Sequence, residues 1–559
     1  MNSKSVLFVT ITLLISSAVL CLPCFKDSAN ILDDMPFHLG RIQSIAANLG
    51  AGNILPTIYG DAVNNFGYAS SLFYPDLWLY IPAMLMLSGF ELIRAYQIFL
   101  VLITLATGIA MYCATNRMLQ NLQIFQHYQQ QQSQFLTIEQ KVSLLATVCY
   151  LAFPYRLINI YLRGALGEIL AFIFLPLVFC GLTEIFLTRK RNWQILMIGM
   201  VGLLYSHIIS SFMVSIFIAL IVPFNLRSAW QLKSALMKAG IFTALLGATF
   251  LLPLIEQMQS NQFYYNTANP FGSLPEQALA VISTPNPSML IAINITVLAL
   301  CYFLYNWLKS WYPEITLLLF LTFYLTFMTS NLFPWFLLGR LPLIKYIQFP
   351  WRIFLFVSYL FPIIFAFVSM HFLAKKASFW YFTLVSIILI SGFLTTDILI
   401  HISANYKQNT SYSPPSISIG RGEYLPAKVK LSAIAKRPAV PMAIAGEMSA
   451  DSYSRSGNIA ELVFSNASPR LSLEFPIIYY KGYVALLNGS PLAVTESKGG
   501  LIHIEIDGIK SGRLAIRYEH TLVQILAFMI SLATALYLVF INFRANSAAV
   551  AKNYQTATS

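Results

Sequence analysis

Long apolar runs separated by short polar or basic stretches dominate this chain. A segment of about twenty apolar residues is long enough to cross a bilayer as a helix. Runs of this kind predict about twelve membrane-spanning helices, near residues 5–22, 92–113, 142–159, 168–187, 193–210, 212–226, 237–255, 288–307, 314–332, 352–373, 377–400 and 521–543. One further apolar run, 75–90, is ambiguous because it is short and contains Asp76 and Pro82.

The basic residues decide how the ambiguous run is interpreted. Short loops rich in Lys and Arg lie on the cytoplasmic side of a membrane. If 75–90 does not cross, the basic clusters between Lys4 and Arg544 all fall on the side of the N-terminus. We therefore expect 75–90 to lie in the interface or to re-enter the membrane. Residues 23–90 then form a large first outer loop, and both termini are cytoplasmic.

The pattern changes between residues 401 and 520. Apolar and polar residues alternate in "RLSLEF", "LIHIEI" and "RLAIRY", with turn signals such as "NGS" and "DGIKSG" between them. Such alternation is typical of short strands with one buried face. We predict a small extracytoplasmic β-sandwich-like domain at 401–520. It would follow a transmembrane domain at 1–400 and precede a last helix and cytoplasmic tail at 521–559.

Composition narrows the class of protein. Of the 559 residues, 57% are hydrophobic and only 10% are charged, which is far from the soluble globular range. The mainly helical chain is therefore predicted to be a multi-pass membrane protein whose surroundings are the lipid bilayer. Its formal charge of +13 is explained by basic cytoplasmic loops, and no nucleic-acid-binding motif accompanies it.

The stretch "ILDDMPFHLGRI" at 31–42 places two acids directly after the first predicted span. Apolar residues then recur at helical spacing, so an amphipathic helix on the outer face is expected. Asp34, His38 and Arg41 share one stripe of it. Asp34 has a structural alternative as the N-cap, worth about 1 kcal/mol. That role does not account for Asp33.

Further charged residues fall at the predicted outer ends of spans. Glu168 and Arg163 lie together in "YLRGALGE", and His207 and Arg352 lie in "SHIISS" and "QFPWRIF". A carboxylate at membrane depth costs roughly 2.5–3.5 kcal/mol on insertion scales, so it usually faces protein or a water-filled site. Each residue also has a structural alternative: Glu168 can favour the helix dipole, His207 can be a packed core residue, and Arg352 can extend to the lipid headgroups. Taken together, the acids and arginines suit an anionic, phosphate-bearing substrate.

Motifs for other chemistries are absent from the sequence. The seven histidines form no zinc pattern, and no nucleotide-binding glycine motif precedes a suitable helix. No cofactor and no metal ligands are predicted from the residues.

Several stretches resemble a known superfamily. The acidic pair, the interfacial helix, the turn "GNILP" at 52–56 and "FYPDLWLY" at 73–80 are similar to the first outer loop of GT-C membrane glycosyltransferases. Within that superfamily, "DDMPFHLGRI", "YLRGALGE", "SHIISS", "QFPWRIF", "GEYLPAKV" and "YYKGYVALLNGSPLAV" resemble bacterial YfhO-like, 6-pyruvoyl-tetrahydropterin synthase-related proteins. The synthase in that name is zinc-dependent, and the His ligands it needs are absent here.

This resemblance implies a GT-C-like bundle and a specific activity. Such enzymes transfer a sugar, usually with inversion, from a polyprenyl-phosphate donor to an acceptor on the non-cytoplasmic face; here the acceptor would be a glycan or cell-wall polymer. The first-loop acid acts as base, which corresponds to Asp33 with Asp34 beside it, and Glu168 matches a second-loop acid. A second Asp-x-Asp is missing, which leaves dependence on a divalent metal ion open.

The remaining candidate residues then have substrate-binding roles. Arg41, Arg163 or Arg352 would stabilise the departing phosphate, while Glu168 and His207 would position donor or acceptor, with His38 beside them. The expected location is the bacterial cytoplasmic (inner) membrane with an extracytoplasmic active face. Two other readings stay open: a transporter or flippase of a lipid-linked glycan, and a non-catalytic membrane scaffold. Charges at span ends rather than mid-span argue against ion-coupled transport.

Overall fold

The computed structural model describes most of the chain. Described residues are 3–25, 34–122, 136–188, 192–224, 226–264, 313–330, 333–335, 344–373, 378–406 and 422–558. Asp33 and the predicted span 288–307 lie outside them. The chain divides into two compact units. Unit 1 comprises 1–46, 76–236 and 268–415; unit 2 comprises 47–75, 237–267 and 416–559.

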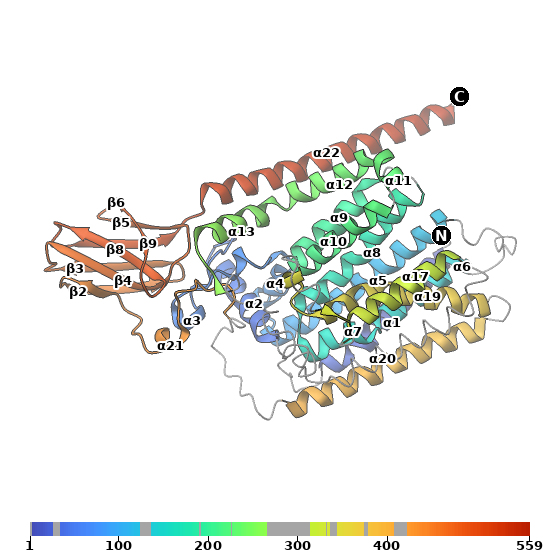
Figure 1. The fold of residues 1–559 in the computed structure, drawn as a ribbon, viewed down its shortest axis with the longest axis horizontal. Coiled ribbons are helices and arrows are strands. Elements are labelled where there is room, and N and C mark those ends of the chain that lie inside the picture. The colour runs from blue at the N-terminus through green and yellow to red at the C-terminus, as the bar shows by residue number, and fades with distance from the viewer. Residues whose placement is uncertain are drawn as a thin grey trace. The chain divides into compact units, whose positions relative to one another are not determined.

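Unit 1 is helical (Figure 1). Its described α-helices are α1 (Ser3–Cys21), α2 (Met35–Gly50, whose last turn belongs to unit 2), α4 (Tyr80–Leu87), α5 (Leu92–Leu122), α6 (Ile138–Leu151), α7 (Pro154–Ile158), α8 (Leu166–Phe186), α9 (Trp193–Ser206), α10 (Ile208–Phe224), α11 (Leu226–Gln231), α17 (Pro313–Met328), α19 (Phe354–Leu373) and α20 (Ser378–Tyr406). Helix α8 packs against α5 and α9, and α5 also packs against α1 and α6. Its core is therefore built around α5 and α8.

Six helices among the described residues are long and apolar enough to cross a membrane, or seven if one bent pair counts as a single span. They are Ser3–Phe25, Leu92–Asn121, Ile138–Arg163, Leu166–Phe186, Pro350–Val368 and Leu522–Arg544, with the bent pair Lys233–Leu246 and Ala248–Ser260. The chain is thus a mainly helical membrane protein. The twelve-helix count is not confirmed, and the GT-C-like bundle stays a prediction.

The ambiguous run of the sequence forms a short helix. Leu77–Leu87 is one of the apolar helices too short for a span, together with Trp193–Ser206, Ile208–Pro223, Leu318–Met328 and Val385–Leu399. At 1.5 Å per residue its length is about 16 Å, roughly half the hydrocarbon thickness of a bilayer. This helix is shorter than a membrane span, and the placement of 75–90 in the interface or as a re-entrant segment stays a prediction.

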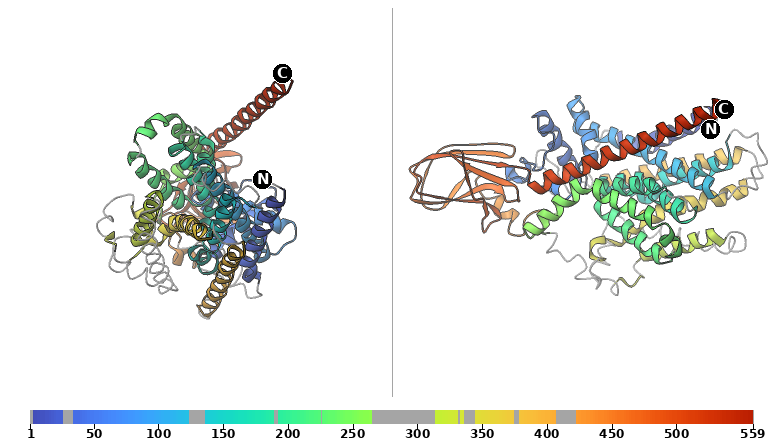
Figure 2. Two further views of the ribbon diagram at one scale, coloured as in Figure 1. Left: turned by 90° about the vertical axis from the view of Figure 1, so that its right-hand side faces the viewer. Right: turned by 90° about the horizontal axis from the view of Figure 1, so that it is seen from above.

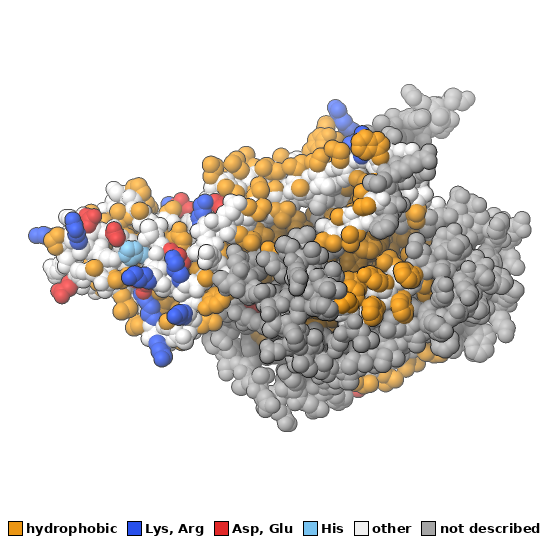
Figure 3. Space-filling view, viewed as in Figure 1, with side chains coloured by type: hydrophobic (Ala, Val, Ile, Leu, Met, Phe, Trp, Pro, Cys, Tyr) orange, Lys and Arg blue, Asp and Glu red, His pale blue; other side chains and the backbone are white. Residues whose placement is uncertain are grey.

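The helices expose large apolar side chains. Examples are Leu7, Leu220 and Ile390 in unit 1 and Val539 and Phe543 in unit 2, each more than half exposed. Figure 3 shows hydrophobic side chains spread over the helices and charged ones gathered over the strands. Soluble monomers rarely expose apolar patches of this extent. Contact with lipid accounts for them.

Unit 2 contains the strands, as the alternating pattern predicts (Figure 2). They are β1 (Met442–Ala445), β2 (Ser449–Ser456), β3 (Ile459–Ser465), β4 (Arg470–Ile478), β5 (Tyr483–Leu487), β6 (Ser490–Leu492), β7 (Thr495–Glu496), β8 (Leu501–Asp507) and β9 (Gly512–Tyr518). The described strands form two antiparallel sheets, ordered β1-β4-β8-β7 and β2-β3-β9-β5-β6. Leu471, Leu473 and Phe475 of β4 alternate with polar residues and are buried, as are Ile504 and Ile506 of β8. The division into domains at residues 400 and 520 stays a prediction.

Unit 2 also holds helices and part of the predicted first loop. Helices α12 (Lys233–Leu246) and α13 (Ala248–Ser260) meet at 67°, α13 packs against α22 (Leu522–Thr558), and the short α3 (Ala62–Asn65) contacts α21 (Leu431–Ile434). The loop around α3 is bound to the sheets because the Ile478 N–H donates to Phe66 O at 2.9 Å and the Arg455 guanidinium donates to Pro476 O and Asn65 O.

Three tyrosines after β4 and at the start of β5 lie mostly inside unit 2. Tyr480 and Tyr483 are buried, and their rings contact Phe263 and Tyr518. Only Tyr479 is half-buried. The two buried rings therefore belong to the packing of the strands.

Candidate functional site

The site begins with an unusual backbone before α8. Residues Asn159–Arg163 form a π-helical turn, and Gly164 then adopts the left-handed conformation with φ 62°. Only glycine takes this conformation readily, so the "RG" of the sequence fixes the reversal. π-turns are frequent at functional sites. The turn places Arg163 Nη1 2.5 Å from Asn159 Oδ1 and 3.0 Å from Glu168 Oε2.

Arg352 reaches the same carboxylate from a distant part of the chain. It lies on the 3₁₀ turn Pro350–Ile353, and its Nε donates to Glu168 Oε1 at 3.0 Å. Its Nη1 donates to Gln348 Oε1 at 2.6 Å. Gln348 has φ 64°, which is strained for a residue with a side chain. The side chain of this strained residue thus helps to hold the Arg352 guanidinium.

Glu168 is the centre of this cluster and is fully engaged. Besides the two arginines, the Tyr155 hydroxyl donates to its Oε2 at 2.6 Å, and only 4% of its side chain is exposed. Two guanidiniums share this one buried carboxylate, and the half-exposed Asp34 carboxylate lies 3.9 Å from Arg163 Nη2. Burying a charge without compensation is costly.

Two buried hydrogen-bond donors lie in the same segments. Asn159 Nδ2 and Trp351 Nε1 have no acceptor among the described residues. Asn159 is the residue that holds Arg163, and Trp351 precedes Arg352 in the chain. Buried donors are almost always paired in folded proteins. The two guanidiniums and the unpaired donors together favour an oxygen-rich anion as a ligand of this cluster.

Asp34 lies at the edge of the cluster. Its N–H donates to Arg163 O at 2.8 Å, and its carbonyl accepts the His38 N–H at 3.3 Å. Asp34 thus occupies the position before α2 that the N-cap hypothesis requires. Its carboxylate lies 3.9 Å from Arg163 Nη2 and is 51% exposed. It is the one acid of the group that solvent reaches easily.

A second buried pair occupies the first turns of α2. Arg41 Nε donates to Asp76 Oδ1 at 2.9 Å, and Arg41 Nη1 lies 3.2 Å from His38 Nδ1. Burial and the Arg41 charge hold the pKa of His38 well below its usual range. His38 is therefore neutral at physiological pH. Because Asp76 compensates Arg41, this arginine has less charge to offer a substrate than the sequence prediction assumes.

His207 connects the two groups. It lies between α9 and α10, and its Nδ1 is 2.8 Å from Ser210 Oγ. Its imidazole is within electrostatic range of Glu168, Arg352 and Arg163, and of His38. Seven of the eight predicted site residues therefore belong to one region of unit 1: Asp34, His38, Arg41, Arg163, Glu168, His207 and Arg352. The eighth, Asp33, lies outside the described residues.

Sequence reasoning missed several members of the cluster. Asp76 was noted only as an obstacle to a span, although an acid inside an apolar run is itself a signal of a buried partner. Tyr155, Asn159 and Gln348 carried no signal, because nothing in a single sequence shows that they face Glu168 or the arginines. No group of three or more His, Cys, Asp or Glu in the described part of the chain is arranged to hold a metal ion.

Comparisons with known proteins add little to this geometry. No protein-family model matches the chain, and no solved structure matches it. An uncharacterized protein of Lactococcus lactis subsp. cremoris (strain MG1363) is 24% identical over 256 residues. The similar region covers 44% of this chain and 39% of the Lactococcus protein, so the chain spans about two fifths of that protein's length. The family and the activity are not established by this likeness.

Proposed function

We propose that the chain is a membrane glycosyltransferase of the GT-C type, related to the YfhO-like proteins. It would move a sugar from a polyprenyl-phosphate donor to a glycan or cell-wall polymer acceptor outside the bacterial cytoplasmic membrane. The observation that carries the proposal is the buried pair Arg163 and Arg352, which share one carboxylate and have a half-exposed acid beside them.

In this proposal the two arginines bind the phosphate of the donor. A guanidinium matches phosphate oxygens bidentately. As the bond between the anomeric carbon and the phosphate oxygen breaks, its electron pair stays on that oxygen. Fixed guanidiniums stabilise this developing charge. Asn159 Nδ2 and Trp351 Nε1, which have no acceptor among the described residues, are further donors in the same segments.

The general base is then an acid at the start of α2. It takes the proton of the acceptor hydroxyl while that oxygen forms the new bond to the anomeric carbon. Asp33 and Asp34 are the candidates, and the half-exposed Asp34 lies 3.9 Å from Arg163. Glu168 is unsuited to the task, since both arginines and Tyr155 occupy its oxygens. It positions the arginines instead. Whether a divalent metal ion assists stays open.

The test uses the full chain in lipid nanodiscs with polyprenyl-phosphate-linked sugars and soluble cell-wall polymer. Loss of the base should lower the transfer rate by about 10²–10⁴-fold. Asp33→Asn and Asp34→Asn are compared singly and together with the control Asp507→Asn, an exposed acid of β8. Transfer at the wild-type rate by the double variant would refute the mechanism. Movement of intact lipid-linked sugar across the bilayer without a covalent product would favour a flippase.

A further inference from the structure

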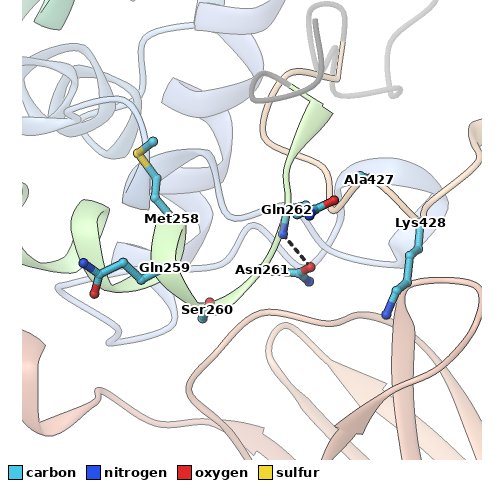
Figure 4. Close-up of a pocket in the computed structure, with 7 residues that line it drawn as sticks. All are labelled: Met258, Gln259, Ser260, Asn261, Gln262, Ala427 and Lys428. Atoms are coloured by element: carbon cyan, nitrogen blue, oxygen red, sulfur yellow. Dashed lines mark hydrogen bonds between the residues drawn. The ribbon is translucent and has the colours of Figure 1, made fainter.

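The pocket at the end of α13 has polar side chains that do not converge on a ligand. Gln259, Asn261 and Gln262 belong to its lining (Figure 4). Both ends of the Asn261 carboxamide are already hydrogen-bonded, to Glu496 and to the Gln262 N–H, and Gln259 is directed away from them. A cluster of buried polar groups lies instead in unit 1, where the end of α1 packs against α5.

The end of α1 carries two cysteines, three positions apart. Cys21 is the last residue of α1, and Cys24 lies in the 3₁₀ turn Leu22–Phe25 that follows it. Both are free thiols; Cys21 is buried and Cys24 is half-buried. A 3₁₀ helix places residues i and i+3 on one face and rises about 2 Å per residue, which separates the two Cα atoms by about 6 Å. Disulfides usually join Cα atoms that are about 4.4–6.8 Å apart, so the backbone places this pair within bridging distance.

Each thiol is held by a single hydroxyl group. Cys21 Sγ donates to Thr104 Oγ1 at 3.3 Å, and Cys24 Sγ donates to the Tyr161 hydroxyl oxygen at 3.3 Å. Both hydroxyls donate their own protons to backbone carbonyls, so the thiols supply the protons of these two contacts. Because S–H groups are weak donors, such contacts are easily exchanged for a bond between the two sulfurs.

A buried cation lies beside the two thiols. Arg156 is fully buried, its Nη2 donates to Thr104 Oγ1 at 2.7 Å, and its Nη1 donates to Leu151 O at 2.9 Å. Its Nε has no acceptor, and no carboxylate of the described residues pairs with it. Cys21 and Cys24 both lie within its electrostatic range. Burial disfavours a thiolate, and a neighbouring arginine offsets part of that cost.

We propose that Cys21 and Cys24 are a redox-active dithiol, assisted by Arg156, that closes by exchange with a disulfide-bearing oxidant at the outer face. The half-buried Cys24 is the thiol that the oxidant reaches. Its thiolate attacks one sulfur of the oxidant, whose S–S bond breaks, and the other sulfur leaves as a thiol. Cys21 then attacks the Cys24 sulfur and releases the second thiol. Two electrons and two protons thereby pass from the cysteines to the oxidant.

The surroundings of the pair suit this exchange. The predicted topology places the end of α1 at the outer face, and disulfides form and persist outside the cytoplasm. Tyr161, which accepts from Cys24, belongs to the π-helical turn Asn159–Arg163, so the pair borders the candidate site. The exchange itself requires no sugar donor and no acceptor polymer, and the dithiol is therefore independent of the proposed function.

The experiment treats the full chain in nanodiscs with oxidised glutathione. After an acid quench and denaturation in SDS, free thiols are blocked with light N-ethylmaleimide. Disulfides are then reduced, and the released thiols receive heavy N-ethylmaleimide for peptide mass spectrometry. We expect heavy label on Cys21 and Cys24 together, and its disappearance after dithiothreitol. Cys149, a half-buried thiol of α6, is the internal control and should stay light.

Single variants separate the roles of the three residues. Cys21→Ser should accumulate a mixed disulfide with glutathione at Cys24, because the thiol that resolves it is missing. Cys24→Ser should accumulate none at the buried Cys21. Arg156→Met should slow closure by about tenfold, since the cation that favours the thiolate is removed, and Arg156→Lys should restore most of the rate.

Three results would overturn the dithiol: no heavy label on the pair, equal heavy label on Cys149, or mixed disulfide formed equally by the two serine variants. Closure by Arg156→Met at the wild-type rate would overturn the part assigned to Arg156. The cysteine variants decide the main point even where the arginine variants do not fold. Sugar transfer plays no part in this assay, so a failure of either proposal leaves the other to its own test.

Discussion

Replacing Glu168 by Gln tests whether the buried cluster depends on its one carboxylate. The substitution keeps the shape of the side chain but removes its charge. Arg163 and Arg352 are 14% and 10% exposed at the side chain, so neither reaches bulk water easily. Arg352 then loses the carboxylate that it contacts, and Arg163 keeps only the half-exposed Asp34 carboxylate at 3.9 Å, while Tyr155 keeps an oxygen acceptor.

The expected loss follows from the number of charges left unpaired. Breaking a buried ion pair by removing one partner costs about 3–5 kcal/mol. A cation at membrane depth costs roughly 2.5–3.5 kcal/mol on insertion scales. Two guanidiniums share the lost carboxylate, but Gln348 and Asn159 still accept hydrogen bonds from them. We expect Glu168→Gln to lower the free energy of unfolding by about 3 kcal/mol.

The assay is reversible unfolding in mixed micelles with an increasing fraction of SDS. Glu91→Gln is the matched control, because Glu91 is an exposed acid of the same unit, just before α5, and surface changes usually stay within about 0.5 kcal/mol. Glu168→Gln/Arg352→Met should recover part of the loss, since one unpaired charge disappears. A loss for Glu168→Gln no larger than that of Glu91→Gln would refute the reasoning.

Three further predictions use the same measurement. Asp76→Asn removes the carboxylate that accepts from the buried Arg41 and should cost about 3 kcal/mol, whereas an effect below 1 kcal/mol would mean that the pair is dispensable. The pKa of His38 is lowered in the folded state, so below pH 6.5 only the unfolded state binds the proton of this imidazole. The free energy of unfolding therefore decreases as the pH is lowered. Relative to His38→Gln, the wild type should lose about 1.4 kcal/mol between pH 7.5 and 5.5, and parallel curves would contradict this. Gly60→Ala places a methyl group against the Gly457 backbone and should cost about 1–3 kcal/mol in unit 2. At Gly457 itself (φ 56°) an alanine meets no atom, so Gly457→Ala should cost only about 1 kcal/mol, and an equal loss for both would remove the steric argument.

The broad organisation of the chain follows from patterns that a sequence displays directly. Apolar length predicts helices such as α5 and α8, and alternation predicts β4, β8 and β9. The number of spans does not follow as directly, because Trp193–Ser206 and Ile208–Pro223 are apolar but short. Hydropathy locates an apolar helix. It does not say whether the helix is long enough, once its ends are formed, to cross the bilayer.

Some contacts of the candidate site can be predicted from the sequence, and others cannot. Arg163 and Glu168 are five residues apart, so their contact is a local matter of one turn, and the sequence suggests it. Arg352 joins Glu168 across 184 residues, and Asp76 joins Arg41 across 35. Those contacts depend on how the helices pack, which hydropathy does not encode. What the sequence does show is that charges are scarce in apolar surroundings, and such charges must find one another.

At Asp34, the backbone holds the residue in place, and the side-chain carboxylate is left for the proposed role as general base. Its N–H is bonded to Arg163 O, and its carbonyl accepts the His38 N–H. Both bonds belong to the backbone and survive replacement of the side chain. Asp34→Asn should therefore keep the start of α2 against the turn that carries Arg163.

Glu168 is different, because its side chain itself holds Arg163 and Arg352. A loss of transfer in Asp34→Asn with unchanged stability would thus report on the carboxylate alone, whereas a loss in Glu168→Gln would combine misplaced arginines with a weakened fold. The acid at the start of α2 is for that reason the position at which a chemical role can be measured most cleanly.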